Sequence, residues 1–229
     1  MDENVSIGRY RLEIWQDEDA QSPRDWDNVG KMICWHSRYN LGDEHSWGSP
    51  RDAWEDLSRL DVDRDLDDEF DINEVEDADL VAAAEKRIVW LPLYLYDHSG
   101  ITMSTGPFGC RWDSGQVGFI YAEKGFEEMT DEQLISCMEG EVRVYDQYLK
   151  GEVYGYKVFE TLTKVINTCE CCGQHLPEPK KIDSYEEGIG SCWGYYGNEH
   201  KKSGLLDAAM EEMNLTPEEV VELKEKVRW

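Results

Sequence analysis

The sequence predicts an α+β fold, with a mostly antiparallel sheet and helices packed on one face. Three observations support it. Segments that alternate apolar and polar residues are interspersed with segments of helical apolar spacing. Strand candidates follow one another in pairs, and no regular strand–helix–strand rhythm connects them. A chain of 229 residues suits one large domain or one domain with an appendage. We expect a main domain over residues 1–200 and a helical appendage over 201–229.

The N-terminal half begins with a strand over residues 9–16, where apolar residues alternate with charged ones. A polar, proline-containing loop follows. The short apolar run at 32–35 fits either a strand or a helical turn. A serine cap followed by proline predicts a helix over 49–60, and a second helix is expected over 75–88. Together they would form an acidic helix-loop-helix insert at about 49–88.

The second half is expected to contain four strands and three helices. The strands are expected over residues 88–96, 116–122, 152–166 and 187–197. The helices are expected over residues 130–149, 205–213 and 216–228. Thr130 and Gln133 form the pattern of a capping box at the start of the longest helix. A cysteine-rich insert at about 168–187 would interrupt the hairpin of the last two strands.

The net charge of -27 and the pI of about 4.4 restrict the class of partner. Such a surface repels nucleic-acid backbones and anionic membranes, so we expect neither direct nucleic-acid binding nor membrane binding. It attracts basic protein surfaces, and a protein that imitates DNA would need the same field. A charged surface that only maintains solubility explains the charge equally well.

The expected location is the cytoplasm. The first residues, "MDENVSIGRYRLEIW", contain no apolar leader segment, and no run approaches the roughly 20 apolar residues of a membrane span. Seven cysteines are an odd number for a disulfide framework. Reduced thiols or a metal site are therefore expected.

The stretch "YLYDHSGITMSTGPFGCRWDSGQVGFIY" has the residue types of an active site. Asp97, His98 and Ser99 cannot form a triad with one another, because consecutive residues of an extended chain point to opposite sides. Turn chemistry explains them better, with Gly100 at a positive φ. The connection is nevertheless longer than a hairpin needs. We therefore expect a ligand cleft at residues 97–116, whose walls would be His98, Trp112, Asp113, Gln116, Tyr145, Asp146 and Tyr148.

The acidic segment "DRDLDDEFDINE" has the ligand spacing of a calcium loop. The expected ligands are Asp63, Asp65, Asp67, the carbonyl of Glu69, and Glu74 as the closing carboxylate. Asp68 stands where such loops have a glycine. A solvated acidic loop is the alternative.

The segment "CECCGQH" has the spacing of a zinc knuckle. Cys169 and Cys172 would supply two ligands, and His175 and Cys192 would complete a tetrahedral site if the flanking strands pair. Reduced surface thiols are the alternative. A further set in "CWHSRYNLGDEH", comprising Cys34, His36, Asp43 and His45, could supply metal ligands or acid–base groups, although packed or surface histidines are commoner.

Several phrases together resemble a protein family found mainly in bacteriophages and other mobile elements. They are "WDNVGKMICWHSRYNLGDEH", "LPLYLYDHSGITMSTGPF", "CRWDSGQVGFIY", "YDQYLKGEVYGY" and "GSCWGYYG", and the resemblance extends roughly from Tyr10 to Gly197. The family has no established activity, so the resemblance transfers no catalytic residue. It implies, by analogy, an accessory protein directed at host machinery.

Three functions follow as hypotheses. The first is an acidic accessory protein that binds and inhibits a host factor with a basic surface, such as a CRISPR or restriction complex, by imitating DNA. The second is a ligand-binding protein or enzyme that uses the loop at 97–116. The third is a structural or accessory phage component, stabilised by zinc or calcium. A catalytic role is expected less than a binding role, because the sequence contains no G-x-S-x-G elbow.

Overall fold

The structure is a computed structural model, which describes residues 3–62, 76–169 and 171–228. The chain divides into two compact units, residues 1–21 with 151–229 and residues 22–150, which we call the first and the second unit. Each unit contains an antiparallel sheet and helices, which confirms the α+β prediction. The division differs from the single main domain expected over residues 1–200. The reason is that β2 and β7 pair with each other, and the second unit occupies the chain between them.

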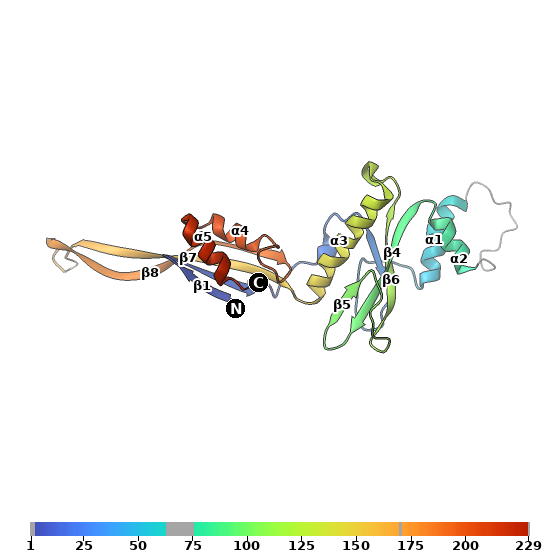
Figure 1. Cartoon of the computed structure of the whole chain (residues 1–229), viewed down its shortest axis with the longest axis horizontal. Helices are drawn as coiled ribbons and strands as arrows, with labels where there is room; N and C mark the ends of the chain where they lie inside the picture. Colours follow the sequence, from blue (N-terminus) through green and yellow to red (C-terminus); the bar gives the residue numbers. More distant parts are fainter. Residues whose placement is uncertain (1–2, 63–75, 170, 229) are drawn as a thin grey trace. The chain divides into compact units, whose positions relative to one another are not determined.

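The first unit contains a four-stranded sheet in the order β1-β2-β7-β8, covered by two helices (Figure 1). The elements are β1 (Glu3–Ile7), β2 (Tyr10–Gln16), β7 (Val153–Thr168), β8 (His175–Tyr196), α4 (Leu205–Glu211) and α5 (Pro217–Lys226). Strand β1 was not predicted from the sequence, whereas β2 lies where the alternation of apolar and charged residues placed it. Gly8, at φ 54°, makes the tight turn between them.

One face of this sheet is the core of the first unit. Leu12 and Ile14 of β2 pack with Leu205 and Leu223 of the two helices, and all four side chains are fully buried. The segment expected as an appendage therefore completes this core through residues 205–227. The capping box at Thr216 begins α5.

Strands β7 and β8 continue past the rest of their sheet as a two-stranded arm. Strand β2 pairs with β7 only as far as Glu160, beyond which β7 and β8 pair with each other alone (Figure 1). The pairing extends to Thr168 opposite His175. The cysteine-rich insert expected at 168–187 is thus mostly strand β8, and only the turn at 169–174 separates the two strands.

The second unit contains a sheet in the order β3-β6-β4-β5. Its strands are β3 (Lys31–Cys34), β4 (Ile88–Asp97), β5 (Ile101–Ser104) and β6 (Ser114–Glu123). Its helices are α1 (Pro50–Val62), α2 (Asp77–Ala84) and α3 (Asp131–Leu149), with short 3-10 turns η1 (Pro23–Asp25) and η3 (Phe126–Glu128). The apolar run at 32–35 is thus a strand, and α2 is shorter than the helix expected over 75–88.

Helices cover both faces of this second sheet (Figure 1). Helix α3 packs through Met138 against Ile120 of β6, whereas α1 packs on the opposite face, where Trp54 stacks on Phe119 with ring centroids 4.2 Å apart. The expectation of helices on one face holds for the first unit and not here. The sequence "GFIYA" in β6 shows why, since a strand buried on both faces is a continuous apolar run.

Candidate functional site

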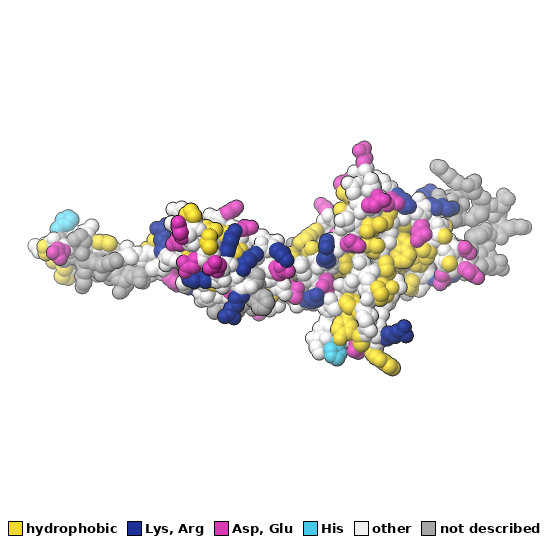
Figure 2. All heavy atoms as spheres, viewed as in Figure 1, with side chains coloured by type: hydrophobic (Ala, Val, Ile, Leu, Met, Phe, Trp, Pro, Cys, Tyr) yellow, Lys and Arg dark blue, Asp and Glu magenta, His cyan; other side chains and the backbone are white. Residues whose placement is uncertain are grey.

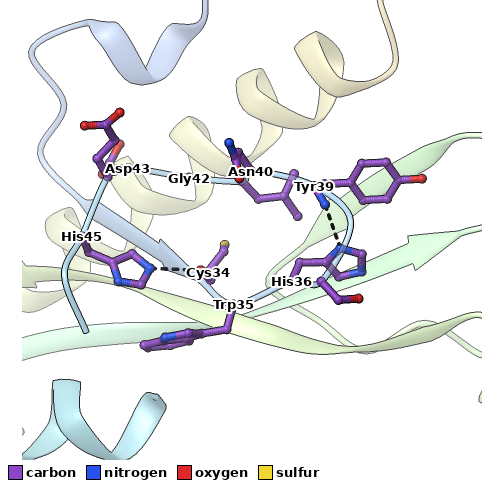
Figure 3. A pocket seen from close by; sticks show the side chains of 11 residues that line it. Cys34, Trp35, His36, Tyr39, Asn40, Gly42, Asp43 and His45 are labelled. Atoms are coloured by element: carbon purple, nitrogen blue, oxygen red, sulfur yellow. Dashed lines mark hydrogen bonds between the residues drawn. The ribbon is translucent and has the colours of Figure 1, made fainter. Parts of the chain in front are cut away.

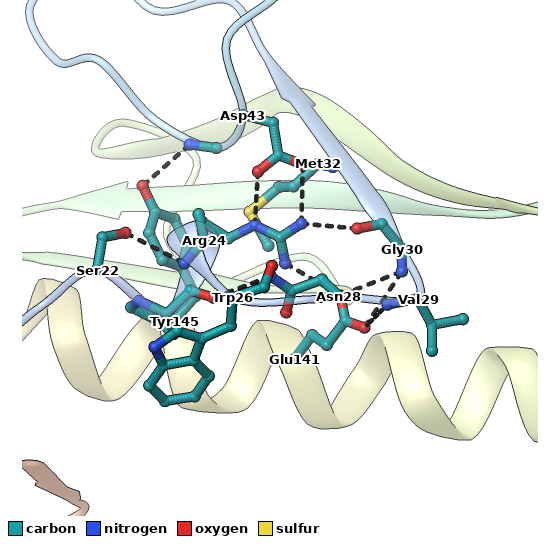
Figure 4. Close-up of polar contacts among 12 residues, drawn as sticks. Ser22, Arg24, Trp26, Asn28, Val29, Gly30, Met32, Asp43, Glu141 and Tyr145 are labelled. Carbon is teal, nitrogen blue, oxygen red and sulfur yellow. Dashed lines mark hydrogen bonds and ion pairs between the residues drawn. The ribbon is translucent and has the colours of Figure 1, made fainter.

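A buried arginine holds together the part of the second unit that precedes the candidate site (Figure 4). The side chain of Arg24 is 5% exposed. Its guanidinium donates to both oxygens of Asp43 at 2.8 Å, to Glu141 of α3 at 3.0 Å and to the carbonyl of Gly30 at 2.6 Å. Burial opposes the charge, yet the hydrogen bonds and charges of the two carboxylates hold the pKa of Arg24 above its ordinary value. The segment from residue 22 to 43 is thereby fixed to α3.

The segment that follows β3 curls around a pocket of about 740 Å³, lined by residues 34–37 and 39–45 (Figure 3). Burial raises the pKa of the Cys34 thiol to about 12, so this cysteine is a neutral, unreactive group at physiological pH. The ring of His45 lies 3.0 Å from the carbonyl of Cys34, and Asp43 is bound to Arg24. The Nδ1 atom of His36 accepts the amide hydrogens of residues 38 and 39. These contacts hold the loop and do not form a metal site.

His36 also lines a second, smaller pocket of about 320 Å³. Its other walls come from β4, from β6 and from the loop at 97–116 in which a ligand cleft was expected. The carboxylate of Asp97, at the end of β4, accepts hydrogen bonds from Arg38 at 3.0 Å and from the hydroxyl of Tyr39 at 3.4 Å. The loop after β3 and the loop before β6 therefore meet around Asp97. Arg38 and Tyr39 were not among the predicted site residues, although the polar segment "WHSRY" directly after a strand was a usable signal for them.

The predicted site residues separate into two groups. His98 and Asp113 come together, with His98 Nδ1 3.4 Å from an oxygen of Asp113, and Trp112 lines the smaller pocket beside Asp113. The remaining four, Gln116, Tyr145, Asp146 and Tyr148, hold the fold instead. Gln116 donates to the carbonyl of Gly118, and Tyr148 stacks on Tyr145.

Helix α3 uses two of those four residues to hold neighbouring segments. The Tyr145 hydroxyl accepts the amide of Gly42 at 2.9 Å, and burial raises the pKa of this tyrosine. Asp146 accepts the amide of Met103 at 2.8 Å, which ties β5 to the helix. Neither side chain lines the smaller pocket around Asp97 and Asp113.

The long connection at 97–116 contains a turn, a strand and a bridging loop. Asp97 pairs with Ile101, and the turn between them has Ser99 at φ 59° and Gly100 at φ 151°. The positive φ expected at Gly100 is confirmed, whereas the Asp97 carboxylate, expected to accept local amides, accepts from Arg38 and Tyr39 instead. After β5, residues 105–113 return across β4 to β6, and we call this segment the anchor loop.

The anchor loop does not assemble a nucleophile beside a base. The thiol of Cys110 donates to Asp113 at 3.6 Å, and His98 contacts the same carboxylate, so the acid lies between the sulfur and the imidazole. A thiol is activated by direct contact with the base. This arrangement holds the loop in place without making Cys110 a nucleophile.

No protein-family model matches the chain, and no similar curated protein or solved structure was found.

Trp112 of the anchor loop is 96% exposed, more than any other large hydrophobic side chain described in the structure. The backbone around it is fixed, since the amide of Asp97 donates to the carbonyl of Asp113 at 2.8 Å and the hydroxyl of Ser114 donates to the carbonyl of Cys110. Tryptophan is among the residue types most enriched in the energetic centres of protein interfaces, so this exposed indole on a fixed loop is a candidate contact.

Three thiols meet at the tip of the β7–β8 arm. The sulfur atoms of Cys169, Cys171 and Cys172 all lie within 4.8 Å of one another, so this cluster could hold a metal ion. The hydrogen bond from Cys171 lowers the pKa of Cys169 to about 7. Gly173, at φ 71°, donates its amide to the carbonyl of Cys169, which closes the turn. Within the described residues no other group of three close potential ligands occurs.

The other two predicted zinc ligands do not join this cluster. Cys192 pairs with Tyr156, about a dozen residues along the arm from the tip, which at about 3.3 Å per residue is roughly 40 Å away. The hairpin pairs as expected, but its register places Cys192 at the wrong end. His175 begins β8 opposite Thr168 and is exposed, outside the group of three sulfurs. The third thiol of the cluster is instead Cys171, which was not a predicted ligand.

The calcium ligands predicted at Asp63, Asp65, Asp67, Glu69 and Glu74 lie outside the described residues.

A group of exposed carboxylates in the second unit lies beside the long helix α3. Exposed acidic residues surround η3 and the first turn of α3, where Figure 2 shows them gathered at that end of the helix. They are Glu123, Glu127, Glu128, Asp131 and Glu132. Lys124, which pairs with Asp131 at 3.2 Å, lies among them.

None of the helices within residues 3–62, 76–169 and 171–228 is both long and apolar enough to cross a bilayer.

Proposed function

We propose that this chain is a binding protein that attaches to a basic partner protein through the anchor loop, with Trp112 as the principal contact. The observation that carries the proposal is the 96% exposure of this indole on a loop whose backbone is fixed. Tryptophan is among the residues most enriched in the energetic centres of protein interfaces. A loop that is ordered before binding loses little conformational entropy on association.

The charge of the chain supports a basic partner. A net charge of -27 accelerates association with positive surfaces and discriminates against anionic ones. The group of exposed carboxylates at η3 and α3 presents part of this field on the same unit as the anchor loop. In the phage setting that the sequence resemblance implies, the partner is a host factor directed at nucleic acid, such as a CRISPR or restriction complex. The acidic chain would inhibit it by occupying the groove that takes DNA.

An enzyme acting at the anchor loop is the weaker alternative. A dyad of His98 and Asp113 could move a proton, but the imidazole is 63% exposed and faces water. The neighbouring Cys110 contacts the carboxylate and not the imidazole. Binding by Trp112 requires none of these groups to act as catalysts.

The experiment compares two tryptophan variants in an affinity pull-down from host lysate. Trp112→Ala should abolish capture of the host factor, whereas Trp26→Ala, on a 46% exposed tryptophan of the same unit, should retain it. Capture by the unmodified chain should weaken as salt rises, and duplex DNA should compete with it. Equal capture by both variants, or capture indifferent to salt and to DNA, would refute the proposal.

We further propose that the thiol cluster at the arm tip binds zinc. Thiolates are preferred zinc ligands, and a cysteine with a pKa of about 7 reaches the thiolate form readily. Three sulfurs leave one of the four tetrahedral positions for a further ligand, for which His175 is the nearest histidine in the sequence. A closed site of this kind would hold the tip of the arm in shape.

Metal analysis of the purified chain tests the zinc proposal. One equivalent of zinc is expected, lost in Cys169→Ser and Cys172→Ser and retained in the matched control Cys192→Ser. His175→Ala distinguishes a histidine ligand, which would weaken zinc retention, from a position filled by water. If Cys192→Ser loses zinc as completely as Cys169→Ser, the assignment to the tip is wrong.

A further inference from the structure

The open face of the sheet in the first unit contains a second aromatic site, which the anchor loop does not explain. The core covers one face of this sheet, and Trp15 of β2 and Trp193 of β8 lie on the other. With the segment after β2 they enclose a cleft of about 540 Å³, a volume typical of ligand sites. Trp193 is 42% exposed.

Both indole rings are held in place. A Cβ atom at Gly155 would collide with the ring of Trp193, so the glycine lets the indole lie directly on the backbone of β7. The indole nitrogen of Trp15 donates to Glu13 at 3.2 Å. The walls of the cleft are therefore formed before any ligand arrives.

A cation already lies against these rings. The ammonium of Lys157 is 5.9 Å from the ring centroid of Trp15 and 5.8 Å from that of Trp193, within the reach of cation–π attraction. Lys157 is itself exposed, so its ammonium can move away from the rings. The lysine marks a position where the faces of both rings favour positive charge.

The rim of the cleft is acidic. Asp17, Glu18 and Asp19 line it, against the single positive charge of Lys157. The amide of Asp17 donates to the carbonyl of Val153, and the side chain of Asp17 accepts the amide of Asp19 at 3.2 Å, which fixes this turn. Two aromatic faces beside an excess of carboxylates form a site for a guanidinium or ammonium group.

We infer that the cleft between Trp15 and Trp193 binds an arginine or lysine side chain of a basic polypeptide, which displaces the ammonium of Lys157. The inference rests on the proposed function for the charge of the partner, and it adds a defined position for one of that partner's cationic side chains. Arginine suits the site better than lysine, because its planar guanidinium stacks on an indole and binds carboxylates through two hydrogen bonds.

A capped tri-arginine peptide is the probe, measured by calorimetry at low salt on the full chain, with indole N–H resonances to locate it. Trp193→Ala should weaken binding at least about five-fold, and Trp26→Ala in the second unit should leave it unchanged. Lys157→Met should tighten binding several-fold, because the competing ammonium is gone. A site for sugars or anions would instead lose affinity when this lysine is removed.

Several outcomes would overturn the inference. One is a cleft that binds tri-glutamate or a neutral trisaccharide more tightly than tri-arginine, and another is weaker peptide binding by Lys157→Met. Thermal unfolding of each variant checks that the fold is intact. If the peptide does not bind but capture of the host factor still depends on Trp112, this inference alone is refuted. If the peptide binds as expected but capture does not depend on Trp112, the proposed function alone is refuted.

Discussion

Replacing Arg24 by methionine tests the contacts that hold the candidate site. Methionine keeps much of the volume and removes the charge, so it leaves Asp43 and Glu141 without their shared cation. Their side chains are only 18% and 14% exposed. Removing one partner of a buried ion pair costs about 3–5 kcal/mol, since a desolvated charge remains.

The structure places the expected loss at the lower end of that range. Asp43 retains the amide of Met32 at 2.7 Å, and Glu141 retains the amide of Val29 at 2.7 Å, so neither carboxylate loses every donor. We expect Arg24→Met to lower the free energy of unfolding of the second unit by about 3 kcal/mol. For a unit of this size that corresponds to a fall of roughly 10 °C in its melting temperature.

Native-state hydrogen exchange is the suitable assay, because a chain of two units need not unfold in one step. The amide of Met32 reports on the second unit, and the amide of Leu12 in the buried core of the first unit serves as an internal reference. Arg51→Met is the matched control, since the Arg51 side chain is 33% exposed and pairs with Glu55 and with Asp77 of α2 at the surface, where such pairs contribute about 0–1 kcal/mol each. A loss below about 1 kcal/mol for Arg24→Met, no larger than that of the control, would refute the reasoning.

Three further predictions concern single positions. The pKa of Cys34 is about 12 in the fold and near 9 in the unfolded chain, so the unfolded state ionises first as the pH rises. The free energy of unfolding should therefore fall between these pH values by up to about 1.4 kcal/mol per pH unit. Chemical unfolding from pH 8 to 10.5 should show that this free energy falls less steeply with pH in Cys34→Ala, and equal slopes would contradict the assignment. A Cβ at Gly118 would meet the carbonyl of Ile33 on β3, so Gly118→Ala should cost about 1–3 kcal/mol or more, whereas Gly109→Ala, where the new atom meets open space, should be nearly neutral in thermal melts. Thr216→Ala removes the capping box of α5 and should cost about 1 kcal/mol, seen as faster exchange of the first amides of that helix; unchanged exchange would argue against the cap.

The predictable parts of the fold are those with a local signal. The capping pattern at Thr130 placed the start of α3, and the alternation over 9–16 placed β2 to within one residue. The division into two units was not predictable in this way, because the pairing of β2 with β7 joins residues more than a hundred positions apart. Likewise, the continuous apolar run of β6 predicted a strand, but it also implied a sheet covered on both faces, and that consequence was not drawn.

The candidate site was predictable only in part, for the same reason. Trp112 and Asp113 stood out by residue type on an over-long loop; both line one pocket, and Asp113 contacts His98. Tyr145 and Asp146 looked like polar walls, but their partners, the amides of Gly42 and Met103, are invisible in the sequence. The zinc prediction failed at Cys192, since only the register of the arm determines which cysteine reaches the tip.

The insertion of the second unit between β2 and β7 has a consequence for the order of folding during synthesis. When β2 has left the ribosome, about 130 residues must be added before β7 appears, which at roughly 5–20 residues per second takes roughly 7–25 s. Throughout this interval the hairpin of β1 and β2 exposes Leu12 and Ile14, and by its end the second unit has all its residues while β7 is still missing. We therefore expect the nascent chain to complete its middle first, and a chaperone that shields apolar hairpins to act on its first twenty residues.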